Sequence, residues 1–409
     1  MKTKEMLVNE EYIMNSKKGM YQFFFAAIVF HMAASFVHPV TPTLIVERQL
    51  DSSMFGVALA AMLFANFAFS PFWGKLCGYI PTKTVLMICG LGYAIGQVIF
   101  GMATTEAMVV GGRMFAGIFT GGMFTAMSNY VINTTVDVSQ RGKNLTVLVT
   151  IQNVCGAVGY FVGGMLGLIS VEITFWVQCA CLIFVGIFMF RFCIDDTSMK
   201  HKPEKKLSMK DANPFSAMLA ARMYTTPMLA LIFIIVAVAG IGQNSFEQCF
   251  NYYIKDQFQL SSAYNGIFKA IIAVVNLICN STICIWMLKK TNTNKTFMPI
   301  IALSTISLGA ILFFDTIVPF VVVDVLFFTL NAIRLPLLQD LCASRTTPEN
   351  SNAVMGFFQS MTSMGGIFGA LFAGLIYDFN PIYPFVLAFV AFAAATGISV
   401  IYVIRYKKE

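Results

Sequence analysis

Charged side chains are scarce in this chain of 409 residues. Asp, Glu, Lys and Arg together make up 11% of the sequence, whereas hydrophobic residues make up 57%. Soluble domains carry about a quarter charged residues, so this chain cannot cover itself with a hydrated surface. A membrane is therefore the expected solvent.

Motifs for catalysis and metal binding are also missing. The sequence has no HExxH, GxSxG or GxxxxGK[ST] pattern, and it has only three histidines. The ten cysteines form no CxxC pair or Cys/His cluster, and most fall inside apolar runs. We therefore predict no enzyme activity, no cofactor and no metal site. Short loops leave no room for a nucleotide-binding domain.

Twelve long apolar runs dominate what is present. A transmembrane helix needs about 20 predominantly apolar residues, and each run approaches that length. The predicted spans are 20–38, 54–72, 84–103, 107–131, 145–169, 172–192, 227–251, 263–288, 297–314, 317–339, 353–377 and 382–404. We expect an all-α integral membrane protein with twelve transmembrane helices in two pseudo-symmetric six-helix bundles.

A basic segment from about Arg191 to Arg222 separates the sixth run from the seventh. We therefore predict a first six-helix bundle, a cytoplasmic linker and a second six-helix bundle, at 1–192, 193–226 and 227–409. A weak internal repeat supports two related halves, because an offset of 207 places Gly159 on Gly366 and Gly167 on Gly374.

The basic residues indicate a topology. With the N-terminus in the cytoplasm, only Arg48 and Lys255 of the 27 Lys and Arg residues fall in external loops. Arg113, Lys269 and Arg334 fall inside spans, and the others lie on the cytoplasmic side. We therefore expect a multi-pass protein of the plasma membrane with both termini cytoplasmic. The net charge of +7 marks topology rather than nucleic-acid binding. We also expect a monomer, and no cleavable signal peptide.

Four short motifs support a family assignment. They are Pro39-Val40-Thr41-Pro42, the loop from Gly74 to Lys83, Arg113-Met114-Phe115-Ala116-Gly117, and Gly159-Tyr160-Phe161-Val162-Gly163-Gly164. In order and position, this set resembles the signature motifs of the major facilitator superfamily, most closely its twelve-helix drug/proton antiporters. The resemblance implies transport by alternating access, with the first, fourth, seventh and tenth helices around a central cavity.

The chain departs from the pattern of that branch at three places. Gly78 occupies the position where the loop motif has an acidic residue. Tyr160 follows Gly159 where the antiporter motif has proline. The first span carries His31 and His38 where many antiporters carry a carboxylate.

Charged residues inside a bilayer are costly, so each one is a functional candidate. Glu247 and Asp324 are the only carboxylates well inside the predicted spans, which makes them the predicted proton carriers. Arg113 and Lys269 fall at a similar depth. These four residues either neutralise one another and fix helix packing, or line a cavity and exchange partners during transport.

Polar residues at helical spacing extend the candidate site. His31, Ser35 and His38 follow an i, i+4, i+7 pattern that predicts one polar stripe on the first helix. The seventh and tenth spans carry similar stripes. The predicted substrate-binding residues are His31, His38, Arg113, Gln243, Asn244, Glu247, Asn251, Asp324, Asn331 and Arg334.

The sequence thus predicts a secondary active transporter that exports a small amphipathic organic compound in exchange for protons. The alternative is uptake or exchange of a metabolite such as an organic anion or a sugar-like compound. Arginine binds carboxylates through two parallel hydrogen bonds, so the three intramembrane cations motivate that alternative. A channel is less favoured, because no filter-like loop is visible.

Overall fold

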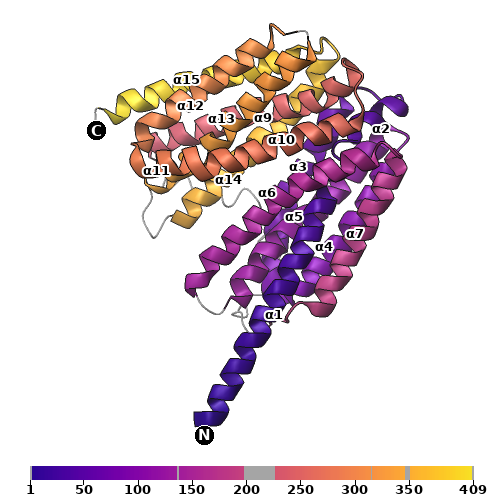
Figure 1. Cartoon of the computed structure of the whole chain (residues 1–409), viewed down its shortest axis with the longest axis vertical. Coiled ribbons are helices and arrows are strands. Elements are labelled where there is room, and N and C mark those ends of the chain that lie inside the picture. The colour runs from indigo at the N-terminus through magenta and orange to yellow at the C-terminus, as the bar shows by residue number, and fades with distance from the viewer. Residues whose placement is uncertain (1, 136–137, 198–225, 315, 346–350, 408–409) are drawn as a thin grey trace. The chain divides into compact units, whose positions relative to one another are not determined.

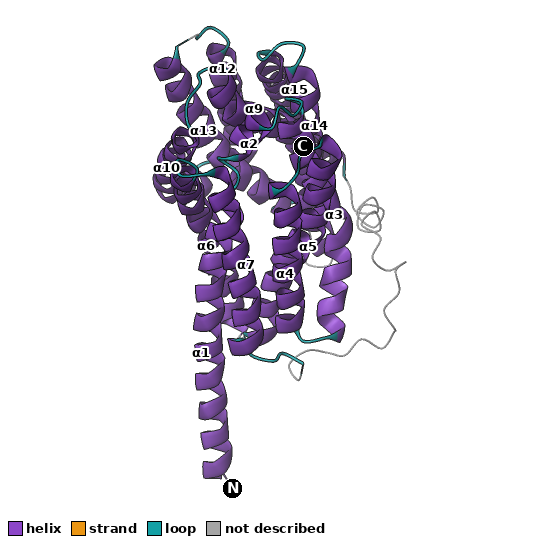
Figure 2. Ribbon diagram, turned by 90° about the vertical axis from the view of Figure 1, so that its right-hand side faces the viewer, coloured by secondary structure: helices purple, strands orange, loops and turns teal. Residues whose placement is uncertain are grey.

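Long α-helices make up the described parts of the chain. The computed structural model describes residues 2–135, 138–197, 226–314, 316–345 and 351–407, and these ranges contain no strand (Figure 2). The first seven helices are α1 (Lys2–Ser35), α2 (Thr41–Glu47), α3 (Met54–Tyr79), α4 (Thr82–Gly101), α5 (Glu106–Thr134), α6 (Val138–Leu166) and α7 (Val171–Phe192). The later helices are α9 (Pro227–Asp256), α10 (Ser262–Cys279), α11 (Ile285–Lys290), α12 (Thr293–Ile311), α13 (Ile317–Ala343), α14 (Ser351–Tyr377) and α15 (Tyr383–Tyr406). A π-helical turn, Asn280–Cys284, joins α10 to α11.

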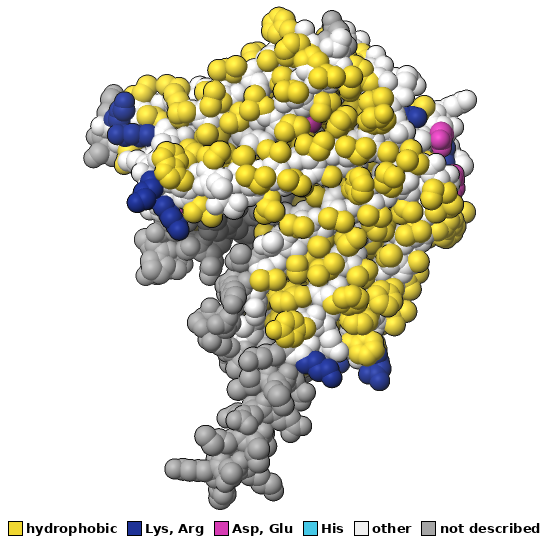
Figure 3. All heavy atoms as spheres, viewed as in Figure 1, with side chains coloured by type: hydrophobic (Ala, Val, Ile, Leu, Met, Phe, Trp, Pro, Cys, Tyr) yellow, Lys and Arg dark blue, Asp and Glu magenta, His cyan; other side chains and the backbone are white. Residues whose placement is uncertain are grey.

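Ten helical segments of the described chain are long and apolar enough to cross a membrane. They coincide with ten of the predicted spans, with α10 and α11 counted as one segment. The helices α1 and α12 cover the other two predicted spans, so the total of twelve stays a prediction. Hydrophobic side chains cover the helices on the face shown in Figure 3, and Lys and Arg side chains lie at the margins of this surface. Apolar side chains over the helices, with charged side chains at the margins, are expected for a surface in contact with the hydrocarbon of a membrane.

The helices gather into two compact units. Unit 1 contains Met1–Val40 and Phe64–Pro214, and unit 2 contains Thr41–Leu63 and Phe215–Glu409. The helix α3 belongs to both, because its first ten residues pack within unit 2. The predicted boundaries at 192 and 226 stay predictions, and linker residues 198–225 lie outside the described residues.

Within unit 1, α4 packs against α5 and α7, and α1 packs against α6 and α7 (Figure 1). Within unit 2, α9 packs against α14 and α15, while α12 packs against α13 and α15. Phenylalanines fill much of the second core, where Phe246 contacts Phe327, Phe328 and Phe385. Each unit therefore buries its own apolar core.

Glycines set the closest helix contacts in both units. A Cβ atom added to Gly159 or Gly163 on α6 would strike the carbonyl oxygen of Met32 or Phe36, respectively. On α14, a Cβ added to Gly365 or Gly369 would meet the carbonyl oxygen of Ala237 or Ile241. In both pairs of helices, glycines four residues apart thus face carbonyl groups four residues apart, which lets the backbones touch.

This shared contact corrects the register of the repeat that the sequence suggested. Gly159 corresponds in its packing to Gly365, whereas the sequence offset of 207 places it on Gly366. A Cβ added to Gly366 would meet only ordinary contacts, the nearest at 3.5 Å. The two halves therefore share this helix contact, in a register that differs by one residue from the sequence alignment. The sequence alignment does not reveal this shift, because apolar residues at neighbouring positions align equally well.

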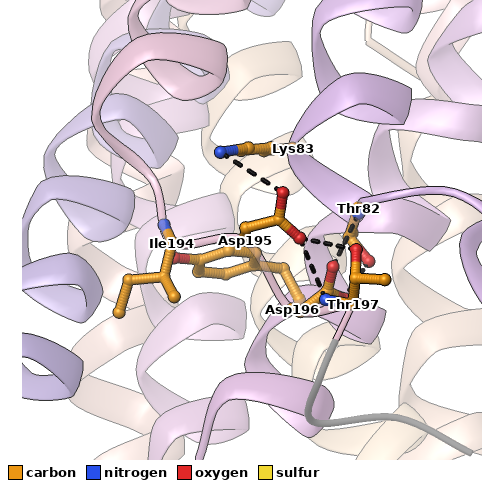
Figure 4. Close-up of polar contacts among 7 residues, drawn as sticks. Thr82, Lys83, Ile194, Asp195, Asp196 and Thr197 are labelled. Carbon is orange, nitrogen blue, oxygen red and sulfur yellow. Dashed lines mark hydrogen bonds and ion pairs between the residues drawn. The ribbon is translucent and has the colours of Figure 1, made fainter. Parts of the chain in front are cut away.

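A buried carboxylate ties the end of α7 to the start of α4 (Figure 4). Asp196 is fully buried and accepts hydrogen bonds from the Thr82 backbone N–H at 2.8 Å, from the Thr82 hydroxyl, and from Asn133 Nδ2 at 2.7 Å. The first N–H groups of a helix have no partner within the helix, so a carboxylate there both satisfies and attracts them. Asp196 thus caps α4 from a distant part of the chain.

The neighbouring Asp195 is about half exposed and makes different contacts. Its carboxylate lies 3.6 Å from the Lys83 ammonium and accepts a hydrogen bond from the Thr197 N–H at 3.0 Å (Figure 4). A further hydrogen bond from the Thr197 hydroxyl is the main cause that holds the pKa of Asp195 below its ordinary value. Exposed ion pairs of this kind contribute little to stability.

We predict that Asp196→Ala lowers the free energy of unfolding by about 2–4 kcal/mol, because Thr82 and Asn133 keep buried donors without an acceptor. Asp195→Ala is the matched control and should change it by no more than about 0.5 kcal/mol. Thermal unfolding of both purified variants in detergent checks this. Equal losses in the two variants would contradict the capping role of Asp196.

A second polar group joins the turn before α3 to the ends of α9 and α14 in unit 2. The Ser52 hydroxyl donates a hydrogen bond to Asp378, and Tyr377 donates one of 2.8 Å to Asp256. Burial, followed by a hydrogen bond with the Asp51 side chain, raises the pKa of Asp378 to about 6. A hydrogen bond with the Ser53 side chain holds the pKa of Asp51 below its ordinary value. The raised pKa of Asp378 beside the lowered pKa of Asp51 assigns the proton of this carboxyl pair to Asp378.

This arrangement predicts a stability that falls as the pH rises. The folded state keeps a proton on Asp378 up to about pH 6, whereas the unfolded chain releases it near its ordinary pKa of 3.8. The contribution is therefore complete below pH 3.8 and is lost as the pH rises through about 6. Asp51 acts in the opposite sense, but only below its ordinary pKa of 3.8.

The thermal midpoint of the unmodified protein should fall between about pH 5 and about pH 7 as Asp378 loses its proton, and Asp378→Asn should make this fall smaller. Asp195→Asn is the control, because the pKa of Asp195 is lowered and the group does not titrate in that interval. Thermal unfolding at the two pH values measures both variants against the unmodified protein. An unchanged pH dependence in Asp378→Asn would show that this carboxyl does not hold the proton.

Candidate functional site

The two carboxylates predicted inside spans lie in unit 2 with one lysine. Lys269 on α10 donates a hydrogen bond of 2.5 Å to Glu247 on α9. The ammonium also lies 4.4 Å from the centre of the Phe328 ring, which stabilises a cation through its π-electrons. The side chains of Lys269 and Glu247 keep 12% and 26% of their surface exposed. The sequence left two alternatives open for the charged groups of these spans, mutual pairing or a role in lining a cavity, and for Lys269 and Glu247 the structure has an ion pair.

Asp324 on α13 occupies a different environment. Its side chain is fully buried, and neither carboxyl oxygen has a hydrogen-bond partner among the described residues. The charges that act on it come from Lys269, which attracts a negative charge, and Glu247, which repels it. Taking an ion out of water costs several kcal/mol even after relaxation, so a carboxylate without donors is strongly disfavoured. Asp324 thus belongs with the ion pair as a third, unsatisfied member.

Arg334 forms a separate polar cluster in unit 2. Its Nε donates to Asn331 Oδ1 at 2.8 Å, and its Nη2 donates to Gln243 Oε1 at 3.0 Å. Asn331 lies one turn earlier on α13, whereas Gln243 comes from α9. The side chain of Arg334 is only 2% exposed. Three of the predicted substrate-binding residues are thus brought together around one guanidinium group.

Unit 1 holds the predicted residues of the first and fourth spans. His31 on α1 is 4% exposed, and its ring stacks on Phe124 at 5.7 Å and meets the edge of Phe30 at 5.2 Å. Arg113 on α5 is buried, with its guanidinium carbon 3.9 Å from the centre of the Phe100 ring. Both side chains are therefore held by aromatic rings.

The predicted polar stripe on the first helix is wrong at its outer end. The helix α1 ends at Ser35, whose hydroxyl donates to the His31 carbonyl at 3.2 Å, so His38 lies in the turn that follows. There its ring stacks on Tyr160 at 5.5 Å. Pro39 follows directly, and a residue before proline is disfavoured in helical conformation. The i, i+4, i+7 spacing therefore does not describe a continuous helical face.

Two other candidates make hydrogen bonds outside the two clusters described above. Asn244 donates its amide to the Gly240 carbonyl of its own helix at 3.0 Å, and the side chain packs beside Gly366 and Gly369. The backbone carbonyl of Asn251 accepts a hydrogen bond of 3.0 Å from Asn265. Asn251 itself is only 5% exposed. These asparagines connect helices α9, α10 and α14.

Sequence reasoning missed two polar contacts of the spans. Gln178 on α7 is buried and donates to the Ala33 carbonyl near the end of α1 at 2.9 Å. Asn265, which holds Asn251, is 2% exposed on α10. The available signal was the same in both cases, a lone amide within an apolar run. Gln178 supplies a donor near the end of α1, where the last carbonyls of the helix have no later turn to bond them.

Comparisons with known proteins agree with this architecture. A family model described as the Major Facilitator Superfamily matches residues 23–343. Multidrug resistance protein 2 of Bacillus subtilis (strain 168) is 21% identical over 91% of this chain and 91% of its own length. Quinolone resistance protein NorA of Staphylococcus aureus (strain MSSA476) is 21% identical over 90% of this chain and 92% of its own length.

A solved structure supports the same fold. The crystal structure of the nucleoside transporter NupG aligns with a TM-score of 0.75 over 95% of this chain and 99% of that chain. The two sequences are 13% identical, so this likeness bears on the fold alone.

Proposed function

Because the chain belongs to the major facilitator superfamily, we propose that it exports small amphipathic organic compounds in exchange for protons, by alternating access. Transport across a membrane is common to its family and to its drug-resistance relatives. The observation that carries the finer proposal is the buried group of Glu247, Lys269 and Asp324. The relatives' names support a drug-like substrate.

Asp324 is the principal proton carrier in this proposal. A carboxyl group that is fully buried, with no donor to either oxygen, suits the uncharged form. When it releases its proton, the new negative charge needs a cation, and Lys269 is the cation whose field acts on it. Release of the proton therefore sets Asp324 in competition with Glu247 for the same ammonium group.

Glu247 then becomes the second proton carrier. The structure has Lys269 paired with Glu247, which matches a protonated Asp324. If Lys269 turns toward a deprotonated Asp324, Glu247 loses its partner and becomes the group that takes up the next proton. The three residues lie on α9, α10 and α13, so this exchange of partners changes the contacts between three helices. Such a change is the kind of two-state step that alternating access requires.

The expected setting is the plasma membrane, with both termini in the cytoplasm. The distribution of Lys and Arg residues supports this orientation. The protein acts as a monomer in this proposal, and its partners are the solute, protons and the lipid bilayer. Within unit 2, Arg334, Asn331 and Gln243 are the proposed contacts of the solute, and a substrate-binding role for His31, His38 and Arg113 of unit 1 stays a prediction from the sequence.

We predict that Glu247→Gln and Asp324→Asn each abolish transport driven by a proton gradient while exchange of solute across the membrane without a gradient continues. Purified protein in lipid vesicles, an imposed pH difference and a fluorescent amphipathic dye measure both activities. Glu106→Gln is the matched control, because Glu106 is an exposed residue at the start of α5. The control should retain both activities.

Two results would contradict the proposal. Gradient-driven transport and its pH dependence that survive in both variants would exclude proton coupling through these carboxyls. Dye that moves in the same direction as the protons would exclude exchange and favour uptake of a metabolite. The same vesicles can then be tested with organic acids and sugars.

A further inference from the structure

Arg334 is a buried cation without an acidic partner among the described residues. The ion pair of Lys83 with Asp195 and that of Lys269 with Glu247 do not include it. Its two hydrogen bonds go to the amide oxygens of Asn331 and Gln243, which carry no net charge. The guanidinium charge is therefore held in place but not neutralised.

Part of the guanidinium group also remains unused. Nη1 of Arg334 is buried and has no hydrogen-bond partner among the described residues. Guanidinium carries five N–H groups, and the two hydrogen bonds to Asn331 and Gln243 leave both protons of Nη1 and the second proton of Nη2. The Nη1 and Nη2 edge is the one that can donate two parallel hydrogen bonds to a carboxylate.

We propose that Arg334, positioned by Gln243 and Asn331, binds a carboxylate group of the transported compound. The proposal rests on the proposed function and narrows its substrate class to amphipathic organic acids. The two amides fix the plane of the guanidinium and leave its charge in place. A permanent carboxylate partner would instead cancel that charge. A ligand carboxylate then supplies the missing negative charge and accepts the unused protons.

The surroundings of Arg334 suit an apolar body attached to that carboxylate. The guanidinium carbon lies 5.7 Å from the centre of the Phe392 ring, and Phe392 belongs to the aromatic core with Phe327. An aromatic or aliphatic group can pack against such rings while the acid faces the guanidinium. A phosphate dianion is less suited, because Arg334 is the one cation that the hydrogen bonds of the described residues place in this cluster.

A comparison with Lys269 indicates that a packing role alone does not account for Arg334. Lys269 is also a cation in an apolar span, but its ammonium has a carboxylate partner at 2.5 Å. The helix α9 thus supplies a carboxylate, Glu247, to Lys269 and a neutral amide, Gln243, to Arg334. Gln243 and Glu247 are one helical turn apart, so either position could have carried the acid.

The test compares 2-naphthoate with 2-naphthamide, which have the same ring system and differ in charge. Isothermal titration calorimetry of the full-length protein in detergent measures binding of each compound, with empty micelles as the blank. We expect the unmodified protein to bind the carboxylate about tenfold to a hundredfold more tightly, as hydrogen bonds to charged groups imply. Arg334→Gln should remove this preference, and Arg334→Lys should keep only part of it, because lysine lacks the planar fork.

Arg405→Gln is the matched control. It makes the same substitution at an exposed arginine near the end of α15, so the net charge changes equally. It should retain the full preference for the carboxylate. Thermal unfolding of each variant establishes that it is folded, and Arg334→Lys keeps the test available if Arg334→Gln does not fold.

Three results would overturn the inference. They are no saturable binding of naphthoate to the folded unmodified protein, an equal affinity for acid and amide, and a preference that persists in folded Arg334→Gln. The measurement needs neither a proton gradient nor transport. Failure of the carboxylate site is therefore distinguishable from failure of proton exchange through Glu247 and Asp324.

Discussion

The ion pair between Lys269 and Glu247 joins α9 to α10 inside helices that consist mostly of apolar residues. In such a solvent, each charged group must find its partner within the protein, because water is not present to hydrate it. The pair leaves Asp324 without a donor among the described residues, since the Lys269 ammonium, whose charge acts on Asp324, is already paired with Glu247. The unsatisfied carboxyl is thus a consequence of the pairing, and the proposed proton exchange depends on this shortage of cations.

The two units satisfy their polar groups by different means. In unit 1, the buried carboxylate of Asp196 caps α4, and the buried cation Arg113 lies against the Phe100 ring. In unit 2, Glu247 pairs with Lys269, whose charge also acts on Asp324, and Arg334 is hydrogen-bonded to neutral amides. The close helix contacts through glycine are nevertheless the same in both units. The shared feature is therefore the packing of the first and fifth long helices of each half, whereas the polar chemistry differs.

The sequence predicted the apolar helices well, because hydropathy over 20 residues is a property of composition and does not depend on distant contacts. Counting residues also placed Glu247, Lys269 and Asp324 at similar depths in their spans, but it left open whether these groups pair or line a cavity. It could not predict that Asp196 caps α4, because that contact joins residues 114 positions apart. Nor could it predict that the Asn244 amide would donate a hydrogen bond to Gly240 of its own helix, since packing determines whether a side-chain amide bonds to a local or a distant acceptor. The displacement of His38 beyond α1 was the one error with a visible local signal, the proline that follows it.

The separation of Asp324 from Arg334 decides how a proton and an anionic solute can influence each other. The two residues lie ten positions apart on α13, which corresponds to about 15 Å along the helix axis. At that distance two charges interact by only about 1 kcal/mol at an effective dielectric constant near 20. Direct attraction is therefore too weak to couple the two events tightly. However, α9 carries both Gln243 and Glu247, and α13 carries both Arg334 and Asp324. A movement of α9 along α13 would alter both clusters together, so helix movement, rather than the field of one charge on the other, would couple the proposed proton exchange to the proposed binding of an anionic solute.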